Sequence, residues 1–277
     1  MKLQTESKFK FGGGIMNISV STGLYYTKSY KEILDTIART SCNNIELFLN
    51  QAFIDVPVEE LAREIESRKL NVLSIHTPLE FIAFKRHESE EFWIDKCINL
   101  SKVFNSKIIV THMVLGEYFA EAPKGLDYIH RENMLKYSKL KDIYVTTENL
   151  PCFADGSFLG RKDEFINYIK DKNIPVTFDT THCAYSNHSI LDMFEEIKDY
   201  VKNIHISDFK DGMEHKVLGT GDLPLKEFLN MLKINDYKGN LTIELDFDNK
   251  KRNDIKDLNE AFNQIERSIQ YIRSNIS

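Results

Sequence analysis

The sequence lacks any run of about 18 consecutive apolar residues, the length that a membrane-spanning helix needs, so it predicts no such helix. It has little cysteine, and none of its four cysteines stands in a CxxC pair. Because that spacing is typical of thiolate metal sites and redox motifs, its absence favours a reduced, cytoplasmic chain. The sequence also lacks an excess of basic residues. Its net charge of −6 gives no general attraction to nucleic acid or an anionic membrane, and leaves open only a local basic patch.

The first 15 residues lack the apolar segment of a signal peptide. Gly12, Gly13 and Gly14 precede Met16, which is typical of a flexible or engineered leader before a native start. We therefore expect residues 1–15 to be such a leader and residues 16–277 to fold as one domain. A chain of 277 residues is long enough for one α/β barrel, since such barrels run to about 250 residues.

What the sequence does have is a recurring strand pattern. Residues 143–151 are rich in β-branched and aromatic side chains, place Glu148 at the end of the predicted strand, and close with Pro151. Three later segments repeat this pattern with other ionisable ends: Val176–Asp179, Asn203–Ile206 and Leu241–Glu244. The resulting set of three carboxylates and one imidazole is one that a divalent metal would hold together. The predicted ligands are Glu148, Asp179, His205 and Glu244.

Strand patterns alternate with helical patterns from Met16 onward, at a spacing of about 30 residues. The predicted strands end near residues 22, 50, 77, 112, 148, 179, 207 and 246. The predicted helices cover residues 29–40, a segment after Pro57, and residues 88–104, 128–140, 162–170, 189–200, 224–232 and 254–273. Eight similar units without a linker predict a single-domain (β/α)8 TIM barrel of the α/β class, with a doubly wound open sheet as the alternative.

Strand parity predicts which side chains point into this barrel, because residues two apart on a strand share a face. Thr242 and Glu244 oppose Leu241 and Ile243. The same separation of polar from aliphatic positions recurs in three other strands, with polar positions at Thr177 and Asp179, at Asn203, His205 and Ser207, and at Ser74 and His76. The aliphatic face is expected to pack on the helices, so the polar face would line the barrel. A polar interior at the carboxyl ends of the strands predicts a site there.

Histidines gather at the same strand ends. His76, His112 and His205 end strands, whereas His182 and His215 lie in the loops just beyond. Histidines at equivalent ends beside a carboxylate cluster favour either a centre with several metal ions or a hydrogen-bonding role. We therefore predict His76, His112 and His215 as further ligands of metal or substrate.

Four motifs resemble those of the xylose-isomerase-like barrel superfamily, and the resemblance covers the chain from Met16 to its end. They are Glu148-Asn149-Leu150-Pro151, Phe178-Asp179-Thr180-Thr181-His182, His205-Ile206-Ser207-Asp208 and His215-Lys216-Val217-Leu218-Gly219-Thr220-Gly221. That superfamily contains sugar and sugar-phosphate isomerases and epimerases together with the endonuclease IV family. Similarity to the sugar enzymes implies metal ligands at Glu148, Asp179, His205 and Glu244, and makes the two glutamates the acid and the base.

The resemblance thus implies a metal-dependent isomerase or epimerase of carbohydrate metabolism that works through an enediolate. Glu244 would take the proton from carbon, Glu148 would return it, and His182 would orient a substrate hydroxyl. The implied cofactor is a divalent ion (Mn, Zn, Co or Mg), and the implied partner is a sugar or sugar phosphate. Whether the enzyme isomerises or epimerises, and whether the barrel is a homo-oligomer, stays open.

A phosphate on the substrate would need its own site. The turn from Gly219 to Gly221 leads into a predicted helix and offers backbone N–H groups where such barrels often hold phosphate. Lys210 and Lys216 flank this turn. We predict these four residues, Lys210, Lys216, Gly219 and Gly221, as a phosphate site.

The main alternative is a zinc phosphodiesterase that acts on abasic DNA, as the endonuclease IV family does. Its further ligands would fall on His76, His112, His182 and His215. Two departures argue against it: Met213 stands where that family has a ligating aspartate, and residues 76–79 lack its tyrosine. The predicted loop 51–57 also carries no Lys or Arg to meet a phosphate backbone. A second alternative is a non-catalytic sugar-binding barrel.

Overall fold

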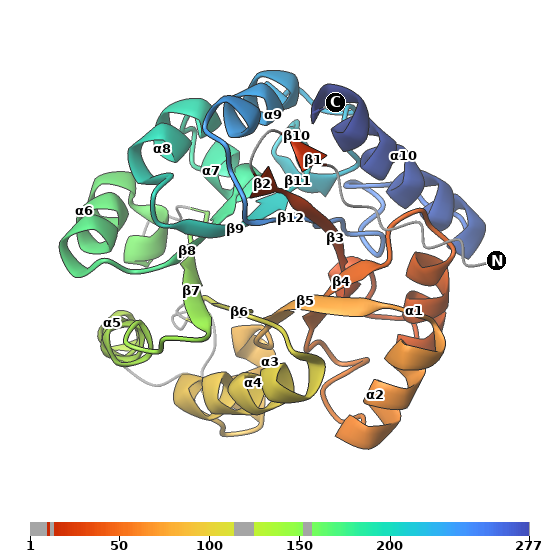
Figure 1. Ribbon diagram of the computed structural model, residues 1–277, viewed down its shortest axis with the longest axis horizontal. Helices are drawn as coiled ribbons and strands as arrows, with labels where there is room; N and C mark the ends of the chain where they lie inside the picture. The colour runs from red at the N-terminus through yellow and green to blue at the C-terminus, as the bar shows by residue number, and fades with distance from the viewer. Residues whose placement is uncertain (1–9, 12–13, 114–124, 152–156, 277) are drawn as a thin grey trace.

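The computed structural model describes residues 10–11, 14–113, 125–151 and 157–276. Among these residues, eight parallel strands close into a barrel in the order β12-β3-β4-β5-β6-β7-β8-β9 (Figure 1). The strands are β3 (Asn17–Ser21), β4 (Asn44–Phe48), β5 (Asn71–His76), β6 (Ile108–Thr111), β7 (Tyr144–Glu148), β8 (Val176–Asp179), β9 (Val201–Ile206) and β12 (Asn240–Ile243). Closure between β12 and β3 confirms the single-domain TIM barrel and rules out the open sheet.

Helices surround the barrel, as Figure 1 shows. They are α1 (Tyr30–Ala38), α2 (Val58–Ser67), α3 (Glu80–Lys85), α4 (Glu90–Phe104), α5 (Leu126–Tyr137), α6 (Lys162–Lys172), α7 (Thr180–Tyr185), α8 (Ile190–Ile197), α9 (Leu225–Ile234) and α10 (Leu258–Ile276). Their ends follow from capping chemistry. Ser29 and Glu32 form a capping box at the start of α1, and Asn105 ends α4 in the left-handed conformation.

Short elements after the strands escaped the sequence patterns. The helix α3 follows β5, and α7 follows β8 directly, with Asp179 as its N-cap. An antiparallel pair of strands, β10 (Asp208–Lys210) and β11 (Met213–Lys216), follows β9. Each lies beyond the carboxyl end of a barrel strand, so all three contribute side chains to the same end of the barrel.

The barrel wall separates two environments, as strand parity predicted. Leu241 and Ile243 of β12 belong to the large apolar core outside the barrel. Inside, hydroxyl and amide groups bond across the strands: Ser19 Oγ lies 2.9 Å from Thr242 Oγ1, which donates to Asn203 Oδ1 at 3.0 Å. The interior is therefore polar and hydrogen-bonded, and the polar layer supports the carboxylates above it.

The segments outside the barrel bear on three predictions. Within residues 1–15, β1 (Lys10–Phe11) pairs with β2 (Gly14–Ile15). The assignment of residues 1–15 as a leader stays a prediction. No helix among the described residues is both long and apolar enough to cross a membrane. Cys183 is buried and its Sγ contacts Met193 Sδ at 3.6 Å, whereas Cys152 lies outside the described residues.

Candidate metal centre

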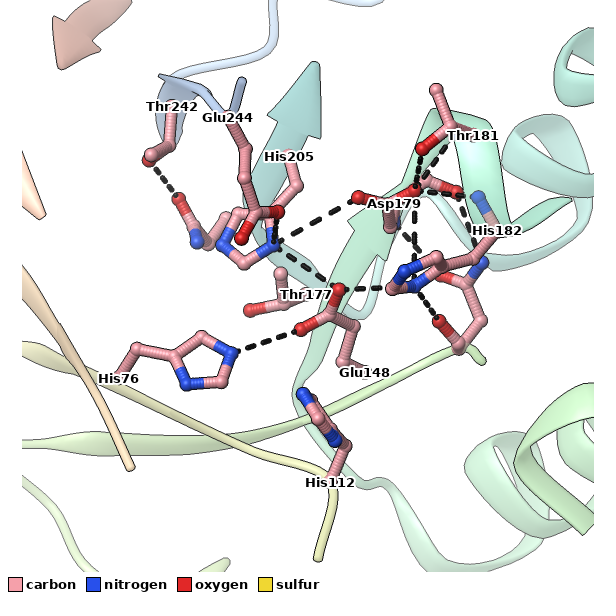
Figure 2. Close-up of polar contacts among 12 residues, drawn as sticks. His76, His112, Glu148, Thr177, Asp179, Thr181, His182, His205, Thr242 and Glu244 are labelled. Atoms are coloured by element: carbon pink, nitrogen blue, oxygen red, sulfur yellow. Dashed lines mark hydrogen bonds and ion pairs between the residues drawn. The ribbon is translucent and has the colours of Figure 1, made fainter. Parts of the chain in front are cut away.

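The four predicted metal ligands come together at the carboxyl ends of four consecutive barrel strands. Glu148 ends β7, Asp179 ends β8, His205 lies in β9, and Glu244 directly follows β12. One ligand atom from each lies within 4.8 Å of those of the other three. Figure 2 shows the imidazole of His205 between the carboxylates of Glu244, Glu148 and Asp179. These four residues are hereafter called the quartet.

One ring nitrogen lies at the centre of the quartet. His205 Nδ1 lies 2.9 Å from Glu244 Oε2, 3.1 Å from Glu148 Oε1 and 4.0 Å from Asp179 Oδ2. The side chains of His205 and Asp179 are fully buried, and that of Glu244 is 14% exposed. Three carboxylates around one nitrogen in a buried site require a cation, because burial of unpaired charge is costly.

The pKa values show which charge balances the carboxylates here. Burial opposes ionisation, but the charge of His205 and its hydrogen bonds hold the pKa of Glu148 and of Glu244 below the ordinary value. Burial raises the pKa of Asp179. For His205, burial opposes the charged form, yet Glu244, Glu46 and Glu148 raise its pKa well above the ordinary value. The proton on His205 thus supplies a positive charge that a divalent ion would supply instead.

Unsatisfied oxygens show that the quartet fits a metal ion. Glu148 Oε2, Asp179 Oδ2 and Glu244 Oε2 are buried and form no hydrogen bond with the described residues. Two of them have only an ion-pair contact with a ring nitrogen, Glu148 Oε2 with His76 at 3.4 Å and Glu244 Oε2 with His205 at 2.9 Å. Buried polar atoms are almost always hydrogen-bonded, so three orphaned oxygens in one cluster indicate a missing ligand. Three carboxylates and one imidazole suit Mn, Zn, Co or Mg, and the fit does not discriminate among them.

A second group of ligand atoms shares Glu148. It consists of His76, His112 and Glu148, and His76 Nε2 lies 3.4 Å from Glu148 Oε2. Both histidines are fixed through Nδ1. His76 Nδ1 lies 2.6 Å from the carbonyl oxygen of Thr77, and His112 Nδ1 lies 2.9 Å from Glu80 Oε1. Burial opposes the charged form, but Glu80 and Glu148 raise the pKa of His112 to about 9.

A third group lies between α7 and the β10–β11 hairpin and includes a carboxylate that the sequence reading missed. It consists of His182, Glu214 and His215, with His182 Nε2 3.7 Å from Glu214 Oε2. The β10–β11 hairpin carries Glu214 and His215 to this position. Met213 has no carboxylate, but its neighbour Glu214 provides one, so the absence of an aspartate at residue 213 does not remove acidic character here.

The predicted catalytic histidine lies beside both the quartet and the third group. His182 Nδ1 lies 2.9 Å from the carbonyl oxygen of Asn149 and 3.3 Å from Glu148 Oε1. Burial opposes its charged form, but Asp179 and Glu148 raise the pKa of His182 to about 10. The ring is thus held in place, with its other nitrogen facing Glu214.

The predicted phosphate site is occupied by a side chain. The amides of Gly219 and Gly221 donate to Asp208 Oδ2 at 3.0 and 2.8 Å. Lys210 Nζ lies 3.8 Å from Asp222, and Lys216 Nζ donates to the carbonyl oxygen of Arg252 at 2.6 Å. The phosphate site stays a prediction, and it would require Asp208 to release both amides.

Aromatic side chains border the second group on one side. The Phe48 ring lies 4.3 Å from the His76 ring, and the Tyr26 ring lies 6.3 Å from that of Phe48. Tyr25 packs on Phe247, with ring centroids 5.5 Å apart.

Sequence reasoning missed three buried or half-buried glutamates at this end of the barrel: Glu46, Glu80 and Glu214. Glu46 stands between Ile45 and Leu47, so strand parity could have assigned it to the interior. Glu80 and Glu214 carry no such signal, because they lie in elements that follow the predicted strands.

Known structures share this fold. They include a D-psicose 3-epimerase crystallised with D-fructose (14% identity, TM-score 0.72, covering 94% of this chain and 99% of that one). A D-allulose 3-epimerase from Methylomonas sp. in complex with D-allulose has 14% identity and a TM-score of 0.70, covering 97% and 99%. An AP endonuclease of family 2 from Brucella melitensis has 16% identity and a TM-score of 0.67, covering 83% and 93%.

Sequence comparison identifies the family of this chain but finds no similar curated protein. No curated protein is significantly similar to this chain. In contrast, the family model described as xylose isomerase-like TIM barrel matches residues 34–274. Together with the closed barrel and the buried ligand groups, this match over most of the length shows that the chain belongs to the xylose isomerase-like TIM barrel family.

Proposed function

We propose that the chain is a divalent-metal-dependent isomerase or epimerase of a sugar or sugar phosphate. The observation that carries this proposal is the pair of glutamates in the quartet. Glu148 and Glu244 both contact His205 Nδ1, at 3.1 and 2.9 Å, so two carboxyl groups converge on one ligand nitrogen. The ketose 3-epimerases among the structures of the same fold support the choice of substrate class.

The reaction needs a proton to leave and return at a carbon next to a carbonyl. A divalent ion in the quartet would polarise the carbonyl and the adjacent hydroxyl of the ketose. Glu244, the more exposed of the two glutamates, takes the proton from carbon, which leaves an enediolate. Glu148 must enter the cycle protonated, and it gives its proton to the other face in an epimerisation, or to the neighbouring carbon in an isomerisation. His182, whose Nε2 lies 3.7 Å from Glu214 Oε2, orients a substrate hydroxyl.

The charges around the site favour a small substrate over a nucleic acid. Arg86 is bound by Asp55 at 2.8 and 3.1 Å. Arg252 is bound by Asp246 and by Glu214, each at 2.7 Å. Among the described residues, these two arginines near the site are therefore neutralised, whereas DNA binding requires cations that can meet phosphates.

One observation favours a second candidate, a metal-dependent phosphodiesterase. The second and third ligand groups lie beside the quartet and share or adjoin Glu148. Adjacent metal ions can hold both the attacking and the leaving oxygen of a phosphate ester. The phosphodiesterase would use the same three groups with a different substrate, so metal count and substrate must be tested together.

The deciding experiment measures deuterium exchange. The metal-loaded protein is incubated with ketoses in D2O, and exchange at the carbon next to the carbonyl is followed by NMR. In parallel, a duplex with an abasic site is tested for nicking. Exchange without nicking supports the proposal, and nicking without exchange overturns it.

Variants then test the two roles. Glu148→Gln and Glu244→Gln should abolish exchange, while Glu59→Gln on the exposed face of α2 should not change it. Full turnover in both quartet variants would show that the assigned acid and base are wrong.

A further inference from the structure

A buried glutamate behind the quartet contacts the metal ligand His205 on its far side. Glu46 lies in β4, and its side chain is fully buried inside the barrel. Its Oε1 and Oε2 lie 3.1 and 3.2 Å from His205 Nε2. The other nitrogen of this ring, Nδ1, faces Glu244 and Glu148. The imidazole of His205 thus lies between Glu46, which contacts Nε2, and the two glutamates of the quartet, which contact Nδ1.

The contact spans the barrel. The strands β4 and β9 are not neighbours in the barrel order, so Glu46 reaches His205 across the interior and not along a shared edge. Two interior groups hold the carboxylate in this position: Ser74 Oγ donates to Glu46 Oε2 at 2.7 Å, and Asn203 Nδ2 donates to the same oxygen at 3.2 Å. A buried carboxylate with two such donors has little freedom to rotate.

We propose that Glu46 is a positioning residue, which accepts the Nε2–H of His205 and thereby turns Nδ1 toward the metal ion of the quartet. A metal-ligating histidine commonly donates its second ring N–H to a carboxylate, which fixes the ring and makes the ligating nitrogen more basic. His112 shows the same arrangement in the second group, where Glu80 binds Nδ1. The proposal rests on the metal site of the proposed function but not on which reaction that site catalyses.

A matched control separates this role from ordinary burial of an ion pair. Glu90 is also a buried carboxylate bound to a histidine, since its Oε1 lies 2.6 Å from His130 Nδ1. His130 is not a member of any ligand group found among the described residues. Glu90→Gln and Glu46→Gln therefore remove the same charge from the same kind of pair, but only Glu46→Gln alters a metal ligand.

The test measures the affinity of the full chain for Co2+ or Zn2+ by competition with a chromophoric chelator. It also records the visible absorption of the Co2+ form, which reports the ligand geometry. We expect Glu46→Gln to weaken binding of the tightest ion about 10- to 100-fold and to shift the Co2+ spectrum. We expect Glu90→Gln to leave both unchanged. Wild-type affinity in Glu46→Gln, or an equal loss in both variants, overturns the proposal.

A milder variant covers the case in which Glu46→Gln does not fold. Ser74→Ala removes the hydroxyl that holds Glu46 Oε2, and it should weaken metal binding in the same direction by a smaller factor. Wild-type affinity and spectrum in Ser74→Ala would then overturn the proposal. Failure of the proposed function would be seen in a different measurement. In that case the wild-type protein would bind metal tightly but would catalyse no deuterium exchange on any ketose.

Discussion

Two buried networks of histidines and carboxylates lie in this molecule, and they differ in completeness. The quartet occupies the carboxyl end of the barrel. The other network, hereafter the α4–α5 network, lies between the outer wall of the barrel and two helices. It consists of Glu90, Thr111, His130, Asn133 and Thr147.

No fully buried side-chain atom of the α4–α5 network is without a hydrogen bond. Glu90 Oε1 accepts from Thr111 at 2.8 Å and lies 2.6 Å from His130 Nδ1, while Oε2 accepts from Asn133 at 2.9 Å. The remaining ring nitrogen of His130 lies 2.8 Å from Thr147 Oγ1. In the quartet, three carboxylates each keep an oxygen without a hydrogen bond. Both networks thus bury a histidine against a carboxylate, but the quartet gathers three carboxylates and leaves an oxygen of each without a hydrogen bond, which indicates a site for a cation.

The largest expected difference between the networks is in activity. Glu148→Gln removes an acid–base group and a metal ligand together, so kcat/KM should fall about 10⁴-fold, or about 5.5 kcal/mol. Glu90→Gln should retain nearly wild-type kcat/KM, because Glu90 contacts none of the quartet. Steady-state kinetics on the best ketose substrate measures both. If kcat/KM falls by a similar factor in Glu148→Gln and in Glu90→Gln, the two networks do not differ in function.

The free energy of unfolding should depend strongly on Glu90, although the activity should not. Glu90→Gln leaves His130 buried without its carboxylate, so the free energy of unfolding should fall by about 3 kcal/mol. Urea unfolding of the metal-free protein measures this loss, with the exposed Glu59→Gln as a control that should stay within about 0.5 kcal/mol of wild type. Wild-type stability in Glu90→Gln would mean that the complete network is not a structural one.

Metal addition should stabilise the chain through the quartet alone. A metal ion at 100 times its Kd should raise the free energy of unfolding by about 2.7 kcal/mol in wild type. The increment should be the same in Glu90→Gln and clearly smaller in Glu244→Gln, which loses a ligand. Thermal unfolding with and without metal provides the measurement, and an increment that depends on Glu90 would contradict the comparison.

The smallest effect concerns acid. Burial raises the pKa of Glu90, but His130 and the donors from His130, Asn133 and Thr111 outweigh it and lower this pKa below 4.5. A lowered pKa in the folded state contributes stability above the ordinary value, and that contribution is lost as the pH falls below it. Wild type should therefore lose more stability than Glu90→Gln between about pH 5 and about pH 3. Urea unfolding of both proteins at several pH values measures this loss. If the free energy of unfolding falls by the same amount in wild type and in Glu90→Gln, Glu90 does not have this role.

Local patterns in the chain were enough to predict most of the framework. The alternation of strand and helix patterns predicted every barrel strand, and the ends of the helices moved by a few residues. Short elements such as α3 and α7 were missed because six residues show too little periodicity to stand out. The convergence of the candidate ligands Glu148, Asp179, His205 and Glu244 was predicted because each lies at or next to the carboxyl end of a strand, and parallel strands in a barrel end at the same face.

By itself the sequence determined which residues point inward, because side-chain parity depends only on neighbours along a strand. Beyond the quartet, only the tertiary structure decided which of them meet. Glu46 and His205 are 159 positions apart and come into contact because the sheet closes on itself. Glu214 reaches His182 because a hairpin folds over the barrel end. Closure and register are properties of the whole sheet, so no local pattern could have predicted these contacts.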